Sequence, residues 1–169
     1  LVGSEMCIRD SLNINQLIEF VLEKLLITQG ASTLVTTMKA NGAVTALVSG
    51  GFTVITEIIR EKLNFDLCYG NTLVVDSSIV TGNLKPPIID ANAKAALLDQ
   101  ECEKLEISRN DTLAVGDGAN DIPMLVNAGL GVGFRPKPVV KNHASNIVEH
   151  CDLRGVLFLQ GFAENEFIT

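Results

Sequence analysis

The sequence predicts an α/β protein built on a doubly wound parallel sheet. Short apolar segments that suit buried strands alternate with stretches of helical periodicity along most of the chain. Two of the buried segments are followed by glycine-rich polar residues, as expected where parallel strands end at a ligand crevice. With 169 residues, 47% of them hydrophobic, the chain is long enough for one domain with a substantial core.

Periodicity defines the elements of the N-terminal half. Residues 14–27 place apolar side chains at helical spacing, whereas AVTALV at 43–48 is short and apolar, as in a strand buried on both faces. SGG at 49–51 predicts a turn, and a Ser-Ser pair at 77–78 predicts a hairpin turn. The predicted elements are helices at 14–27 and 31–41, a strand at 43–48, a helix that ends near residue 63, and a hairpin within 64–84.

The same alternation continues to the C-terminus. DTLAVGD at 111–117 is a second buried strand, and the segment after it ends in a glycine, which is typical of a helix C-terminus. The predicted elements are helices at 90–105, 120–129 and 153–160, and strands at 111–117, 130–134 and 146–150. Parallel strands with crossover helices follow from this order.

Charge and cysteine content favour a cytoplasmic protein that acts on a small molecule. The net charge is −7 and the sequence has no run of Lys or Arg, which argues against nucleic acid or an anionic membrane as a partner. The four cysteines are scattered and form no CxxC pair. No apolar stretch approaches the ~20 residues that span a bilayer.

A first candidate site lies in VSGGFT at 48–53. Ser49 and Gly50 stand between a predicted strand and a predicted helix, where backbone N–H groups, a hydroxyl and the positive end of the helix dipole can meet an anion. The alternative is a tight turn with a capping serine.

A second and stronger candidate is GDGAND at 116–121. Asp117 directly follows a strand and offers a hard oxygen ligand that suits Mg²⁺. Asp121 can cap the next helix or orient Lys94 or a metal-bound water, and the Asn120 amide can reach a bound oxyanion. The alternatives are a capped turn for this segment and a solvated surface lysine for Lys94.

Three segments resemble the haloacid dehalogenase superfamily. VSGGFT at 48–53, DANAKAALL at 90–98 and VGDGANDIPML at 115–125 are similar, in order, to its second, third and fourth motifs. The residues in these motifs resemble those of the phosphoserine phosphatase group in particular. The resemblance extends over residues 14–169.

The resemblance implies Mg²⁺-dependent hydrolysis of O-phosphoserine through an aspartyl-phosphate, as in serine biosynthesis. It implies that Ser49 and the Gly50 N–H hold phosphate oxygens and that Asn120 contacts the substrate. It further implies that Lys94 neutralises the phosphoryl charge and pairs with the nucleophile, and that Asp117 binds Mg²⁺ with Asp121 in support. Positioning and charge neutralisation dominate such phosphoryl transfer.

The sequence departs from this family in one respect. The family's first motif, DxDx[TV], supplies the nucleophile and the general acid, and this chain contains no DxD. We therefore expect residues 1–11 to be a non-native leader, 12–28 the remnant of a small helical cap, and 29–169 a core without its first strand. A genuine divergent N-terminus is the alternative for 1–11.

Three functions remain open from the sequence. The first is an inactive fragment of a phosphoserine phosphatase. The second is a non-catalytic phosphate-binding module, and the third is a phosphatase of the same superfamily with another small phosphomonoester substrate.

Overall fold

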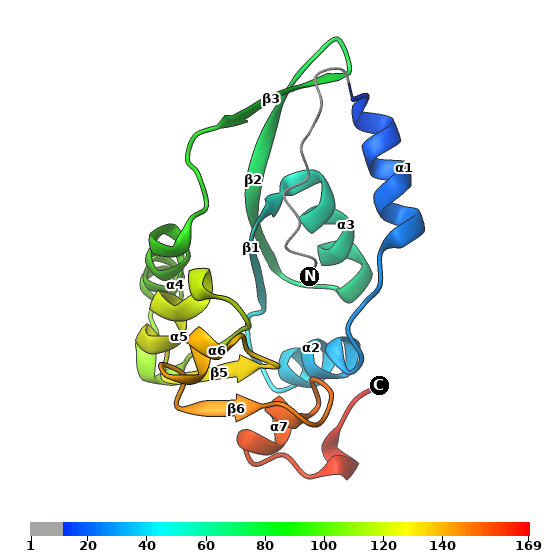
Figure 1. The fold of residues 1–169 in the computed structure, drawn as a ribbon. Coiled ribbons are helices and arrows are strands. Elements are labelled where there is room, and N and C mark those ends of the chain that lie inside the picture. Colours follow the sequence, from blue (N-terminus) through cyan, green and yellow to red (C-terminus); the bar gives the residue numbers. More distant parts are fainter. Residues whose placement is uncertain (1–11) are drawn as a thin grey trace.

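A computed structural model describes residues 12–169 (Figure 1). The expected leader, residues 1–11, lies outside this range. No helix in the described part of the chain is both long and apolar enough to cross a bilayer.

The elements are α1 (Ile14–Lys24), α2 (Ala31–Ala40), β1 (Ala46–Phe52), α3 (Thr53–Leu63), β2 (Leu67–Asp76), β3 (Ile79–Lys85), α4 (Ala91–Leu105), β4 (Leu113–Gly116), α5 (Ile122–Asn127), β5 (Leu130–Phe134), α6 (Pro138–Lys141), β6 (Asn146–Val148) and α7 (Gly155–Leu159), with short 3₁₀ turns at Arg109–Asp111, Ala119–Asp121 and Glu164–Glu166.

The strands form two sheets, in the orders β1-β2-β3 and β4-β5-β6. All pairs are parallel except the β2–β3 hairpin, which confirms the expected α/β class. The single sheet that the sequence predicts is divided because no strand within residues 12–169 joins β1 to β4. In this part of the chain β1 pairs only with β2, and β4 only with β5.

Helices cover both faces of the β4-β5-β6 sheet, as in a doubly wound fold. On one face Ala114 of β4 packs against Leu125 of α5 and Val140 of α6. On the other face Val132 of β5 packs against Val156 of α7, and α2 lies alongside (Figure 1). Alternation of side chains along the strands separates these two apolar clusters.

The helix α1 lies along the β2–β3 hairpin (Figure 1). Leu17 of α1 is 2% exposed and packs with Leu73 and Val80 of the two hairpin strands. Ser77 and Ser78, the predicted turn, both have positive φ, as a two-residue hairpin turn of type I′ requires. The assignment of residues 12–28 to a helical cap stays a prediction.

The strand β1 begins three residues later than its predicted start at residue 43. The reason is Asp66, whose carboxylate accepts the Thr45 N–H at 2.8 Å and the Thr45 hydroxyl at 2.8 Å. The Thr45 N–H is therefore bonded to a side chain, and only its carbonyl contacts β2, by accepting the Leu67 N–H at 3.0 Å. Val48 then pairs with Tyr69 of β2, but the next pair in the register is Phe52 with Asn71. The predicted turn at 49–51 is therefore a bulge within β1.

Candidate functional site

A buried ion pair joins two of the predicted site residues. The Lys94 Nζ of α4 donates to the Asp121 Oδ1 at 2.6 Å, and the two side chains are only 6% and 9% exposed. Lys94 lies in the first turn of α4, which begins after Asp90, whose carboxylate caps the helix by accepting the Ala93 N–H at 2.8 Å. Lys94 is thus not a solvated surface lysine.

The second carboxylate oxygen of Asp121 organises the turn after β4. It accepts the N–H groups of Asp117 at 3.1 Å and Gly118 at 3.0 Å. Gly116 must lack a side chain, because a Cβ there would lie 2.5 Å from the Cβ of Asp121. Pro123 stands in the first turn of α5, where its missing N–H costs nothing. Asp121 therefore caps the turn and orients Lys94 at the same time.

Asp117 and Asn120 lie at the mouth of this turn. Asp117 is half-buried, its carbonyl accepts the Lys137 N–H at 2.9 Å, and its carboxylate takes no hydrogen bond from the described residues. Asn120 is exposed, and its amide oxygen lies against Gly118. Both side chains are free to meet a ligand.

These residues do not by themselves fit a magnesium centre. Within residues 12–169 no group of three or more His, Cys, Asp or Glu side chains converges to hold a metal ion. Asp117 offers one carboxylate where Mg²⁺ usually needs several oxygen ligands. The donor set is therefore incomplete in the described part of the chain.

The bulge of β1 forms the other half of the candidate site. The Gly51 N–H donates to the Ser49 Oγ at 3.0 Å, and the Gly50 carbonyl accepts the Asn71 Nδ2 at 2.8 Å. Bulges of this kind re-aim side chains near strand ends. The first turn of α3 follows directly and has no side-chain cap, so its orphan N–H groups remain available.

The helix α4 links the two halves. Within residues 12–169 no hydrogen bond or ion pair connects Ser49 or Gly50 directly to Lys94, Asp117, Asn120 or Asp121. On the β2 side, the Tyr69 hydroxyl donates to Glu101 of α4 at 2.6 Å, and partial burial with this contact raises the pKa of Tyr69 to about 12. On the β4 side, α4 holds Asp121 through Lys94.

Sequence reasoning missed what β2 contributes to the site, although LCYGN at 67–71 lies within the segment 64–84 that the sequence predicts as short strands. Tyr69 and Asn71 face α4, while Gly70 faces α3, since a Cβ on Gly70 would lie 2.9 Å from the Thr56 hydroxyl. Glycine and asparagine are both rare inside strands. A Gly-Asn pair between apolar residues is the signal that indicates a close backbone approach there.

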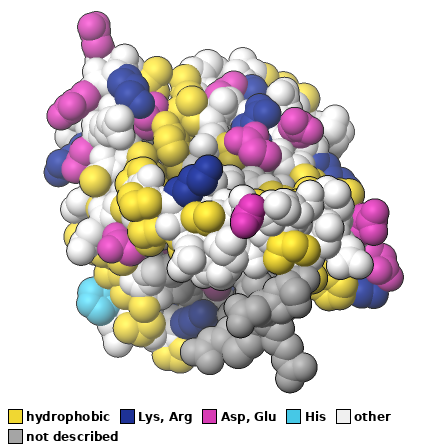
Figure 2. All heavy atoms as spheres, turned by 90° about the horizontal axis from the view of Figure 1, so that it is seen from above, with side chains coloured by type: hydrophobic (Ala, Val, Ile, Leu, Met, Phe, Trp, Pro, Cys, Tyr) yellow, Lys and Arg dark blue, Asp and Glu magenta, His cyan; other side chains and the backbone are white. Residues whose placement is uncertain are grey.

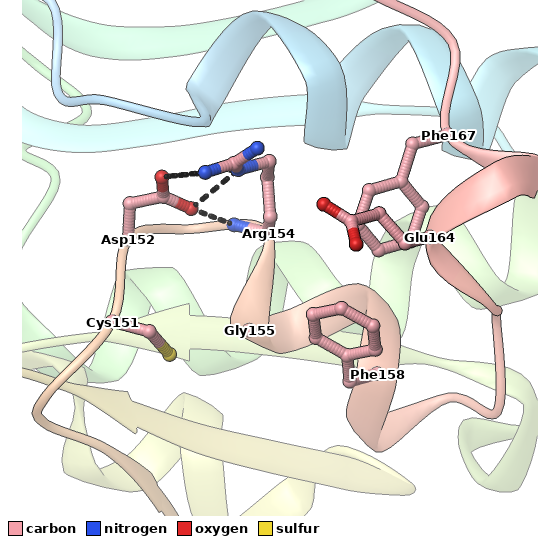
Figure 3. A pocket seen from close by; sticks show the side chains of 7 residues that line it. All are labelled: Cys151, Asp152, Arg154, Gly155, Phe158, Glu164 and Phe167. Carbon is pink, nitrogen blue, oxygen red and sulfur yellow. Dashed lines mark hydrogen bonds and ion pairs between the residues drawn. The ribbon is translucent and has the colours of Figure 1, made fainter.

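A hollow near the C-terminus contains none of the predicted residues (Figure 3). Its lining residues are Cys151, Asp152, Arg154, Gly155, Phe158, Glu164 and Phe167. The Arg154 guanidinium donates to both oxygens of Asp152 and holds the pKa of that carboxyl below its usual range. Because Arg154 is paired with Asp152 and none of the predicted site residues lines it, the hollow is a weaker candidate than the Lys94–Asp121 centre.

The surface drawn in Figure 2 shows basic and acidic side chains interspersed. This agrees with the net charge of −7 and gives no broad basic area on that face.

The fold and the GDGAND turn of this chain are features of a family of hydrolases. The sequence profile described as haloacid dehalogenase-like hydrolase matches residues 9–126. The chain belongs to this family, as the sequence analysis expected.

Within the family the chain is similar to phosphoserine phosphatases. It is 38% identical over 140 residues to the phosphoserine phosphatase of Methanocaldococcus jannaschii, an alignment that covers 83% of this chain and 66% of that protein. The fold matches a probable phosphoserine phosphatase from Vibrio cholerae with a TM-score of 0.84 and 34% identity, covering 91% of this chain and 47% of that one. A structure described as a phospho-aspartyl intermediate analogue of phosphoserine phosphatase matches with a TM-score of 0.83 and 37% identity, covering 89% and 71%.

The chain spans only part of these relatives. It covers 66%, 41% and 34% of the length of three curated phosphoserine phosphatases that it matches.

Proposed function

We propose that this chain is the phosphoryl-binding part of a phosphomonoester hydrolase whose substrate is O-phosphoserine. The observation that carries the proposal is the buried Lys94–Asp121 pair beside Asp117 at the end of β4. Similarity to phosphoserine phosphatases at 38% identity favours phosphoserine over other small phosphomonoesters. A role in serine biosynthesis and a cytoplasmic location are part of the same proposal.

Each residue has a distinct task in binding the phosphoryl group. The Ser49 oxygen already accepts the Gly51 N–H, so its own proton can be donated to a phosphoryl oxygen, next to the Gly50 N–H. The Lys94 ammonium gives one of its three donors to Asp121 and keeps the others for the ligand. Asn120 adds an amide donor at the mouth of the site.

The charge of Lys94 explains why Asp121 is buried beside it. An unpaired ammonium is costly to bury, and Asp121 compensates it while the two backbone N–H groups compensate Asp121. Asp121 thus fixes the position of the Lys94 ammonium, a charged donor, before the substrate arrives.

Magnesium binding requires oxygen ligands beyond the described residues. We propose that Asp117 is one ligand of Mg²⁺, which neutralises phosphoryl charge when bound, and that the remaining carboxylates come from a DxD motif that this chain lacks. Calorimetry on the chain alone should then detect no Mg²⁺ binding below millimolar concentrations. Micromolar affinity would contradict this division of ligands.

The chain on its own should bind phosphate without hydrolysing phosphoserine, since covalent catalysis needs the missing nucleophile. The test is a calorimetric titration with inorganic phosphate, together with a phosphate-release assay on O-phosphoserine and Mg²⁺. We expect binding that Lys94→Met and Ser49→Ala each weaken, and no release. Release of phosphate by the purified chain, or binding unaffected by both substitutions, would refute the proposal.

A non-catalytic phosphate-binding module is the second candidate, favoured by the incomplete metal donor set. The coding DNA upstream of Leu12 distinguishes the two. An open frame that encodes DxDx[TV] and a helical cap supports the phosphatase, whereas a start codon before Leu1 without that motif supports the module.

A further inference from the structure

Asn71 of β2 is a buried polar residue whose amide is fully engaged. The residue is only 4% exposed. Its Nδ2 donates to the Gly50 carbonyl at 2.8 Å and, more weakly, to the Ile89 carbonyl at 3.5 Å, while its Oδ1 accepts the Ile89 N–H at 2.7 Å. Each contact is to backbone on another segment, so Asn71 joins the β1 bulge to the loop before α4.

The hydrogen bond from Asn71 to the Gly50 carbonyl restrains Ser49. The Gly50 carbonyl and the Gly51 N–H belong to the same planar peptide group. Asn71 holds the oxygen end of that plane, and the nitrogen end donates to the Ser49 Oγ at 3.0 Å. A rotation of the Gly50–Gly51 peptide would break both contacts. Asn71 therefore restrains the Ser49 hydroxyl through one rigid plane, at a position where two glycines would otherwise leave the backbone loose.

The hydrogen bonds between Asn71 and the Ile89 backbone restrain Lys94. The Ile89 backbone, held at both its N–H and its carbonyl, immediately precedes Asp90, the N-cap of α4. The Asp90 carbonyl accepts the Lys94 N–H at 3.1 Å, so Lys94 lies one helical turn after Asp90, the residue that follows the anchored Ile89. The hydrogen bonds between Asn71 and Ile89 thus determine the position at which the first turn of α4 begins.

We propose that Asn71 is a positioning residue that fixes the separation between the Ser49 hydroxyl and the Lys94 ammonium. This inference rests on the proposed function for its ligand, a phosphoryl group, and adds a residue that touches neither the phosphate nor the metal. Burial alone explains a hydrogen-bonded asparagine, but it does not require that the three contacts go to the two backbone segments that carry Ser49 and Lys94. That arrangement is what a spacer for the two anion-binding groups needs.

Two substitutions separate this role from a general effect on stability. Asn71→Asp keeps an oxygen for the Ile89 N–H but places a second oxygen opposite the Gly50 and Ile89 carbonyls. It therefore removes the short contact to Gly50 and the weaker one to the Ile89 carbonyl, while the contact to the Ile89 N–H remains. Thr81→Val is the matched control, because it removes a side-chain hydrogen bond to the Val74 carbonyl within the β2–β3 hairpin without touching α4 or the Gly50–Gly51 peptide. Circular dichroism and thermal unfolding check that each variant is folded.

Phosphate affinity and amide NMR spectra give the two readouts. We expect Asn71→Asp to weaken inorganic phosphate binding about tenfold, the typical effect of one lost buried hydrogen bond, and to shift the Gly51 amide resonance in the free protein. Thr81→Val should leave the affinity within about twofold and the Gly51 resonance in place. Unchanged affinity in Asn71→Asp, or an unmoved Gly51 resonance, would overturn the inference.

Measurements on the unmodified chain keep the inference testable if Asn71→Asp does not fold. Inorganic phosphate should then shift the Asn71 side-chain amide resonances, although Asn71 does not contact the ligand, and no shift would count against the bridge. If the unmodified chain binds no phosphate, the proposed function fails. In that case the Gly51 resonance of Asn71→Asp still decides whether Asn71 holds the peptide: movement supports the restraint and no movement overturns it.

Discussion

Replacing Lys94 by methionine gives the sharpest test of the buried ion pair. The Nζ–Oδ1 distance is 2.6 Å and the side chains are 6% and 9% exposed, so the substitution leaves the Asp121 carboxylate in the interior without its counter-charge. Breaking a buried pair in this way costs about 3–5 kcal/mol. We expect Lys94→Met to lower the free energy of unfolding by about that amount, measured by urea denaturation at pH 7.

The double variant shows whether the loss belongs to the pair. In Lys94→Met/Asp121→Asn neither charge is left alone, and the asparagine oxygen can still accept backbone N–H groups. Its loss should fall short of the sum of the two single losses by about 2 kcal/mol. Lys62→Met, an exposed substitution on α3, is the control and should change stability by less than about 0.5 kcal/mol. Additive losses would refute the pairing argument.

Three further predictions concern other parts of the fold. Lys39 holds the pKa of Asp66 at about 2, below its ordinary value, so the stabilisation is complete above about pH 4 and fades toward pH 2. Allowing for screening at a side chain 34% exposed, Asp66→Asn should cost about 1 kcal/mol at pH 7 in urea titrations; a loss that stays the same down to pH 2 would contradict this. Gly116→Ala should cost about 1–3 kcal/mol by displacing Asp121, and a melting temperature equal to that of the parent would show that the close contact can relax. Leu17→Ala should cost about 2–5 kcal/mol and speed hydrogen exchange throughout α1, whereas unchanged exchange would place the anchor of α1 elsewhere.

Local patterns predicted most elements of this fold because their signals are short in range. Apolar spacing placed α1 and α4 to within a few residues, and the Ser77-Ser78 pair located the hairpin turn. Wherever one residue type decides the local backbone, the sequence was informative.

The predictions from the sequence are wrong where contacts between residues far apart along the chain determine the structure. The start of β1 depends on Asp66, which is 21 residues away along the chain from Thr45. The division into two sheets depends on strand pairing, which no local pattern encodes.

The candidate site was predicted in part. The residues Lys94 and Asp121 were expected to work together, and the structure places them in contact at 2.6 Å. The phosphate and metal roles of Ser49, Gly50, Asn120 and Asp117 stay predictions. The role of Asn71 was not predicted because its partners are the backbone atoms of Gly50 and Ile89, and the Gly-Asn pair indicates only a close backbone approach and not which segments it joins.

The way α4 is anchored also bears on the order in which the molecule folds. The hairpin closes across two residues, whereas the hydrogen bonds that fix the site close loops of 18 residues at Asn71–Ile89, 27 at Lys94–Asp121 and 32 at Tyr69–Glu101. Longer loops lose more chain entropy on closure and form contacts more slowly. The hairpin should therefore nucleate early, and the polar centre should assemble only after α4 has docked between the two sheets, as one of the last steps of folding.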